Sequence, residues 1–231
     1  DLSALPVLYL AKKVIIVGDD KQVSPTGSFT KLDELNSLAA STIKDVLPNW
    51  ALFSANTSLY DIAATICQPL MLREHFRCVP EIIGFSNRLS YDGKIKPLRD
   101  SSSSDLLPAM VNYRVDGLRD GRRKTNEVEA NTIVSLIQAM LCVKQYKDKT
   151  IGVISLNGKD QAKLIQNKLV SKLNLTEYQR HQILCGTSAE FQGDERDVVF
   201  LSMIDSNEKG TGPIRKMGAP DSQPGKDLRR R

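Results

Sequence analysis

The segment at residues 187–202 carries the side chains with the greatest capacity for chemistry. It reads Thr-Ser-Ala-Glu-Phe-Gln-Gly-Asp-Glu-Arg-Asp and continues as Val-Val-Phe-Leu-Ser. Apolar runs at residues 183–185 and 198–204 flank the polar part, and short apolar runs bounded by turn residues predict buried strands. Open α/β sheets bind phosphate-bearing ligands in the loops that follow their strands. The polar loop therefore predicts a phosphate site at the mouth of a sheet.

Three further segments combine an apolar run with polar residues. Residues 14–17 are apolar and lead into a Gly-Asp-Asp-Lys-Gln run, with a proline three residues later. In residues 72–87 an aromatic-arginine pair precedes Pro80, and proline is favoured at the first position of a helix. Residues 151–155 form an apolar run that ends in serine, and Gln161 follows it.

In their order along the chain, these segments resemble the motifs of superfamily 1 helicases with a Gln-Gly-x-Glu signature. The segment at residues 14–25 resembles motif III, residues 72–87 resemble motif IV, residues 151–161 resemble the element before motif V, and residues 187–202 resemble motif V itself. The resemblance covers most of the chain and is closest to the group that moves 5′ to 3′. It implies a RecA-like motor domain that uses ATP.

Other motifs of that family are absent from the sequence. The chain has no Gly-x-x-x-x-Gly-Lys-Thr/Ser phosphate loop, no Asp-Glu pair of motif II to hold magnesium, and no final arginine motif after the strand at Val198. We therefore expect an excised fragment. Residues 1–67 would be the C-terminal remnant of the first RecA-like domain, and residues 68–231 the second RecA-like domain, truncated before the last motif.

The resemblance also assigns roles at the nucleotide. Gln22 would reach the γ-phosphate and the attacking water, and Arg77 would place a permanently charged, bidentate guanidinium against the γ-phosphate. Glu195 would accept from the ribose or orient neighbouring groups. The remaining ATP-binding candidates are Gly18, Asp19, Gln192 and Gly193. The structural alternatives are a turn at Gln22, a surface salt bridge at Arg77 and a loop ion pair at Glu195.

Four hydroxyl and amide side chains form a second candidate set. Thr187 and Ser188 match the family hydroxyls that touch the nucleic-acid backbone, and Ser155 and Asn157 are expected to extend the same track. Capping of a turn or helix is the alternative for each. Ser155 is followed by Leu-Asn-Gly where the family more often has proline and an aromatic residue. Asp197 is interpreted as belonging to the start of the following strand.

Composition restricts the class of protein without deciding it. The 231 residues are 41% hydrophobic and 26% charged, with a net charge of +5, which is compatible with a polyanionic partner. The four cysteines are scattered and predict neither disulfides nor a zinc site, so a reducing cytoplasm, or a nucleus in a eukaryote, is expected. No run of apolar residues approaches the roughly 20 needed to cross a bilayer.

The pattern of elements predicts an α/β fold, a RecA-like parallel sheet with helices on both faces, beside the remnant of the first domain. Asn126 is expected to cap a helix, with Glu129 at capping-box spacing. An apolar stripe from Ala130 to Leu141 predicts that helix's buried face. The expected strands are residues 14–17, 70–72, 111–115, 151–156, 183–185 and 198–204, and the other expected helices are residues 58–64, 80–89 and 162–173. Residues 207–226 are expected to form a flexible excursion.

Three hypotheses follow. The first is a fragment of an ATP-dependent helicase that moves along single-stranded DNA or RNA, needs ATP and Mg²⁺ in its parent, and joins the missing first motor domain of its own chain. The fragment alone would neither hold these cofactors tightly nor hydrolyse ATP. The second is a degenerate helicase-like module that binds nucleic acid or protein without ATPase activity. The third is a different α/β nucleotide-binding enzyme.

Overall fold

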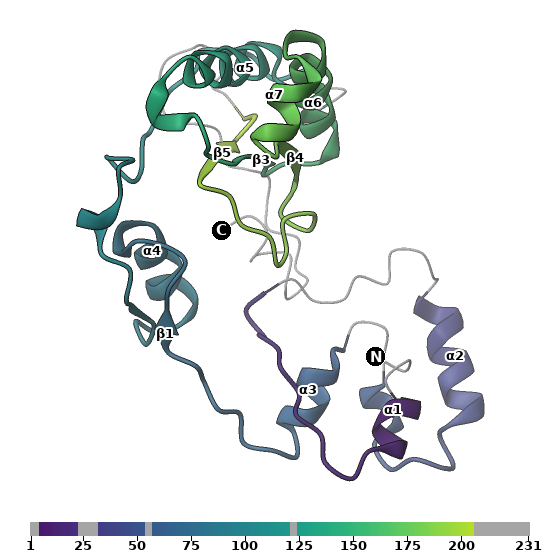
Figure 1. The fold of residues 1–231 in the computed structure, drawn as a ribbon. Helices are drawn as coiled ribbons and strands as arrows, with labels where there is room; N and C mark the ends of the chain where they lie inside the picture. Colours follow the sequence, from purple (N-terminus) through teal and green to yellow (C-terminus); the bar gives the residue numbers. More distant parts are fainter. Residues whose placement is uncertain (1–4, 23–31, 54–56, 121–123, 206–231) are drawn as a thin grey trace. The chain divides into compact units, whose positions relative to one another are not determined.

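The computed structural model describes residues 5–22, 32–53, 57–120 and 124–205. The chain divides into two compact units, residues 1–73 and 74–231. Figure 1 traces both units. Each is described separately below. The segment at residues 207–226, expected to be flexible, lies outside the described residues.

Helices make up the described part of the first unit. They are α1 (Leu5–Leu10), α2 (Leu32–Thr42) and α3 (Leu59–Ala64), with a 3-10 turn, η2, at Trp50–Leu52. Helix α3 begins where the sequence indicates. The Ser58 side chain accepts from the Asp61 amide, and the Asp61 carboxylate accepts from the Ser58 amide, which completes a capping box.

The strand expected at residues 14–17 is absent, and that prediction is wrong. Val14, Ile15 and Val17 are 47%, 91% and 89% exposed, and the segment has no ladder. A strand needs a neighbour to pair its amides and carbonyls. The described part of the first unit contains no other strand, so the apolar run has nothing to pair with.

The second unit is built on a parallel sheet of order β4-β3-β5. Its strands are β3 (Ile151–Ser155), β4 (Leu184–Thr187) and β5 (Val198–Ser202). Ser155 is the Cα partner of Thr187 on one side and of Ser202 on the other. All three strands therefore end level at one edge of the sheet. The parallel α/β prediction is confirmed.

Helices α5 (Glu127–Leu141) and α6 (Lys159–Lys172) cover one face of this sheet, as Figure 1 shows, and α7 (Leu175–Arg180) follows them. One apolar cluster joins all these elements, so the helices share a face. Its members are Ala130, Ile133, Val134 and Ile137 of α5, Ile151 and Val153 of β3, Ile165 and Leu169 of α6, and Ile183. The predicted stripe on α5 is the buried one. Side chains alternate between the two faces of β5, and Val199 and Leu201, on the face away from this cluster, are 43% and 57% exposed.

Asn126 caps α5, but the expected reciprocal bond from Glu129 does not form. The Asn126 side chain accepts from the Glu129 amide at 3.0 Å. The backbone amide of Asn126 donates instead to Gln161 Oε1 at 2.8 Å. The Glu129 carboxylate accepts from the amides of Met203 and Ile204, each at 2.8 Å. The Asn126 side chain also donates to the Ile204 carbonyl at 3.1 Å, so both side chains fix the chain that leaves β5.

A smaller substructure precedes α5. Two-residue strands β1 (Glu74–His75) and β2 (Lys96–Pro97) pair in parallel, and α4 (Pro80–Ser90) lies between them in sequence, with Pro80 at its first turn as expected. Short 3-10 turns occur at Ser101–Ser103 (η3) and Lys144–Tyr146 (η4).

Two more expected strands are wrong. Residues 70–72 and 111–115 form no ladder, and Leu70, Val111 and Tyr113 are 88%, 73% and 64% exposed. Apolar residues favour a strand only where a sheet edge is available to receive them.

Candidate functional site

An exposed ion pair joins two segments more than 100 residues apart in sequence. Arg77 Nε lies 2.8 Å from Glu195 Oε2. Their side chains are 53% and 68% exposed. Arg77 can therefore exchange Glu195 for an anion from solution, and Glu195 can exchange Arg77 for a hydroxyl group. Neither exchange leaves a buried charge unpaired.

Hydrogen bonds to the backbone around Arg77 hold this residue in place. It lies between β1 and the first turn of α4, and its carbonyl accepts from Arg99 Nη1 at 2.8 Å. The Cys78 amide next to it donates to His75 Nε2 at 3.0 Å, and the Leu98 amide donates to the His75 carbonyl. These bonds fix the turn and leave the Arg77 guanidinium free to change partners.

Glu195 lies on residues 188–197, which we call the crossover loop because they connect parallel strands β4 and β5. Its anchor is Arg196, whose side chain is 12% exposed. Arg196 Nε donates to the Gln182 carbonyl at 3.0 Å, and Nη1 donates to the Glu195 carbonyl and the Asp194 carboxylate. The Glu195 carboxylate is left to face Arg77.

The crossover loop lies against the face of the sheet opposite α5 and α6 (Figure 1). A Cβ on Gly152 of β3 would stand 2.7 Å from Phe191 Cε1 and 3.2 Å from Arg196 Cγ. Only glycine lets the loop approach this closely. At its far end Asp197 Oδ2 accepts from the amide and the hydroxyl of Thr150, both at 2.8 Å, so Asp197 serves the start of β5 as expected.

This path corrects the expected location of the site. Parallel strands require the connection to return from the carboxyl edge of the sheet to the amino edge. Thr187 therefore lies at the carboxyl edge, whereas Glu195 lies near the amino edge, three residues before β5. The two candidate sets occupy opposite ends of one loop, and the sequence reading had placed both at the mouth of the sheet.

Two aspartates of the loop have lowered pKa values. The pKa of Asp194 is lowered by the Glu195 amide and then by Arg196. Partial burial raises the pKa of Asp197, but bonds from Thr150 and the nearby Lys149 and Arg99 outweigh it, so the net pKa is lowered. Both groups are therefore anionic near neutral pH. The donors at this end, Arg77 and Arg99, fit a polyphosphate.

Gln22 and Asp19 lie together in the first unit. Gln22 Nε2 donates to Asp19 Oδ2 at 2.8 Å, and the Lys21 amide donates to Asp19 Oδ1 at 2.9 Å. Gly18 lies against Tyr60 of α3, whose ring carbon Cδ2 would be 2.8 Å from an added Cβ. The motif III loop is thus a turn with an exposed amide.

The nucleic-acid candidates differ in accessibility. Ser155 is 2% exposed, and its hydroxyl donates to the Gly158 carbonyl at 2.7 Å, which favours the capping alternative. Asn157 donates to Asp205 Oδ2 at 3.2 Å. Thr187 and Ser188 are half-buried. The Thr187 amide and hydroxyl both donate to Glu190 Oε2, at 2.6 and 3.1 Å.

Sequence reasoning missed Arg99, Arg196 and Thr150. Arg196 is flanked by acidic residues on both sides, a pattern that could have indicated an internal anchor. Arg99 and Thr150 carry no local signal, because each acts on a residue more than twenty positions away. The exposed Gln192, and Gly193 with φ of 82°, lie on the loop between Phe191 and Asp194.

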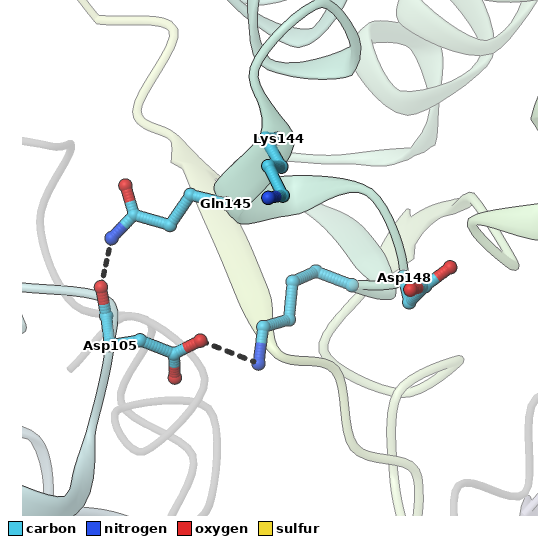
Figure 2. A pocket seen from close by; sticks show the side chains of 5 residues that line it. Asp105, Lys144, Gln145 and Asp148 are labelled. Atoms are coloured by element: carbon cyan, nitrogen blue, oxygen red, sulfur yellow. Dashed lines mark hydrogen bonds and ion pairs between the residues drawn. The ribbon is translucent and has the colours of Figure 1, made fainter.

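A solvent-open pocket of about 520 Å³ lies elsewhere in the second unit. It is lined by Asp105, Lys144, Gln145, Asp148 and Lys149. Figure 2 shows the side chains around it. Lys149 Nζ is 3.7 Å from Asp105 Oδ2, and Gln145 donates to the Asp105 carbonyl. The two lysines and two aspartates balance, so the lining of the pocket carries no net charge.

The described residues contain neither a metal-ligand cluster nor a membrane-spanning helix. No group of three or more His, Cys, Asp and Glu side chains in that part of the chain could hold a metal ion. No helix among the same residues is long and apolar enough to cross a membrane.

Comparison with known proteins gives consistent matches. Residues 54–219 match the AAA domain family. The chain is 29% identical to an uncharacterized ATP-dependent helicase of Mycoplasma genitalium, with 93% of this chain and 20% of that protein covered. It is 26% identical to the mouse 5′-3′ DNA helicase ZGRF1, over 90% of this chain and 11% of the relative. Helicase sen1 of Schizosaccharomyces pombe is 24% identical over 92% of this chain and 12% of its own length. The chain thus spans a fifth or less of these relatives.

Proposed function

Because this chain belongs to the AAA domain family and resembles superfamily 1 helicases, we propose that it forms part of an ATP-dependent motor that moves along single-stranded nucleic acid. Residues 1–67 would belong to the first motor domain and residues 68–231 to the second. The Gln-Gly-x-Glu loop and the relative named as a 5′-3′ DNA helicase favour 5′-to-3′ movement. DNA and RNA are both candidate tracks, in the cytoplasm or a nucleus.

The crossover loop is the observation that carries this proposal. One end bears Glu195, paired with Arg77, and the other end follows directly from Thr187. The loop has no regular secondary structure between β4 and β5 and places Phe191 against Gly152 of β3. A change of partner at Arg77 would therefore be transmitted along the eight positions from Glu195 back to Thr187, the proposed nucleic-acid contact.

At the nucleotide end, Arg77 would stabilise negative charge that develops on the γ-phosphate, and Arg99 would hold the Arg77 backbone in place. Glu195 keeps the guanidinium oriented until a nucleotide competes for it. Gln22, in a turn shaped by Gly18 and Asp19, would keep the γ-phosphate role that its motif suggests. Gln192 and Gly193 would line the same end. ATP brings the reacting phosphates with Mg²⁺, whose carboxylate ligands we place in another part of the parent.

At the nucleic-acid end, Thr187 and Ser188 would contact phosphate and sugar. Such contacts position the strand without reading its sequence, as a translocating protein requires. Ser155 and Asn157 would hold the backbone at this edge of the sheet in place and would not contact the strand, since their side chains already donate to the Gly158 carbonyl and the Asp205 carboxylate.

Nucleotide release by the full-length parent, with and without single-stranded DNA and RNA oligomers, tests the proposal. A motor should show turnover that rises when single strands are added, whereas residues 1–231 alone should show none. If the parent binds the oligomers but shows no ATP turnover with or without them, the degenerate module is favoured. Turnover by residues 1–231 alone would contradict the expected division of catalytic parts.

A further inference from the structure

Glu190 takes up the polar donors at the end of β4. Its Oε2 accepts from the Thr187 amide at 2.6 Å and from the Thr187 hydroxyl at 3.1 Å. The Glu190 amide donates back to the Thr187 carbonyl at 3.1 Å. The Thr187 amide is the main cause that lowers the pKa of Glu190, so the group is a carboxylate at neutral pH.

The backbone beneath Glu190 is shaped to admit it. A Cβ on Gly186 would stand 2.9 Å from both Glu190 Cβ and Glu190 Oε2. Any other residue at position 186 would push the carboxylate away from Thr187. The side chain nevertheless remains 47% exposed, so it can leave without opening the core.

The donors that Glu190 occupies suit a phosphate equally well. A backbone amide next to a hydroxyl is a common contact to phosphate oxygens in nucleic-acid complexes. The second carboxylate oxygen, Oε1, lies 3.9 Å from Lys159 Nζ, and lysine is a cation that phosphates attract. Amide, hydroxyl and ammonium group thus surround an anionic position that Glu190 fills from within the chain.

We propose that Glu190 competes with the nucleic-acid phosphate for Thr187, so that a single strand binds only when the Glu190 carboxylate leaves. This inference rests on the proposed function, because it takes Thr187 as a strand contact. Lys159 then exchanges the carboxylate for the incoming phosphate. A chain whose donors are blocked most of the time binds more weakly in proportion to the open fraction.

The test is binding of a fluorescein-labelled oligo(dT) and oligo(U) to the full 231-residue chain, measured by anisotropy at several salt concentrations. Glu190→Ala should tighten binding roughly fivefold to tenfold, which corresponds to a carboxylate seated about 80–90% of the time. Glu190→Gln, which keeps an acceptor and loses the charge, should fall between. Lys159→Ala should weaken binding and make the salt slope shallower by about one phosphate contact.

Glu127→Ala is the matched control. Glu127 also pairs with a lysine, Lys168, at the start of α5, so Glu127→Ala removes an equal charge without removing a bond to Thr187. It should change binding less than twofold. Circular dichroism melts of each variant check that the fold is retained, and Glu190→Gln supplies the answer should Glu190→Ala not fold.

The outcomes separate the two proposals. Tighter binding by Glu190→Ala but not by Glu127→Ala supports competition. Equal or weaker binding by Glu190→Ala overturns it, because Glu190 would then be a structural cap, while strand binding by the wild type still supports the proposed function. An absence of binding by every variant at low salt contradicts the strand contact itself and this inference with it.

Discussion

The guanidinium of Arg77 lies 2.8 Å from the carboxylate of Glu195, although 118 positions separate them in sequence. The pair links the turn before α4 to the crossover loop. Since both side chains are more than half exposed, the pair is available to a ligand. Such a pair is typical of a site whose partners change, and contributes little to holding a fold together.

We therefore expect the pair to matter little for stability. Arg77→Ala and Glu195→Ala should each change the free energy of unfolding by less than about 1 kcal/mol, because solvent screens exposed pairs. Urea unfolding of each variant measures this, with the substitution of an exposed arginine within α4, Arg88→Ala, as control. A loss of several kcal/mol for Arg77→Ala alone would show that the residue holds the fold.

Gly152→Ala should disturb the crossover loop through Phe191. The new methyl group would lie 2.7 Å from Phe191 Cε1, and such overpacking costs about 1–3 kcal/mol. In a Phe191→Ala background the ring is gone, so the cost of Gly152→Ala should fall by at least half. Unfolding free energies of the two single variants and the double variant give the coupling. An unchanged cost in the Phe191→Ala background would refute the contact.

Gln161→Ala should be strongly destabilising. Gln161 is fully buried and exchanges two hydrogen bonds with the Asn126 backbone, at 2.8 and 3.2 Å. Its loss leaves the buried Asn126 amide unpaired, while the Asn126 carbonyl keeps the bond from the Ala130 amide; the cost should be roughly 1–3 kcal/mol. Asn167→Ala, at an exposed position of α6, is the control and should cost less than about 1 kcal/mol. Equal midpoints of unfolding in urea for both variants would contradict the stabilising role of the Gln161 hydrogen bonds.

Asp197 should stabilise the fold in a pH-dependent manner. Its pKa is lowered on folding because the bonds from Thr150 outweigh partial burial. The contribution is therefore present above the unfolded pKa of about 4 and lost as pH falls through the folded value. The unfolding free energy of wild type minus that of Asp197→Asn should be positive at pH 7 and shrink toward pH 3. A difference that stays constant over this range would exclude a role for the charge.

Much of the fold can be predicted from the sequence where the signal is local. The helix expected at residues 58–64, the proline that opens α4 and the apolar stripe from Ala130 to Ile137 each depend on residues within one or two turns. The apolar runs at residues 14–17 and 70–72 carry equally strong local signals. They form no strand because strand formation requires a neighbouring strand that the described part of the chain does not provide.

The candidate site shows the same limit. The resemblance to superfamily 1 motifs singled out Arg77 and Glu195 as candidates, but it could not show that the crossover loop carries Glu195 away from Thr187 to the other edge of the sheet. That separation follows from the parallel order β4-β3-β5. Gln161, part of a recognised motif, is used inside the structure to hold Asn126. A motif residue can therefore serve packing as well as chemistry.

ATP hydrolysis by Arg77→Ala in the full-length parent is the most direct measurement of the central proposal, that Arg77 acts on the nucleotide. Single-turnover hydrolysis and ATP affinity should be measured together, with Arg88→Ala as control. We expect Arg77→Ala to lose at least about 100-fold in hydrolysis rate while ATP affinity stays within about tenfold of wild type. Hydrolysis at the wild-type rate by Arg77→Ala would contradict the account.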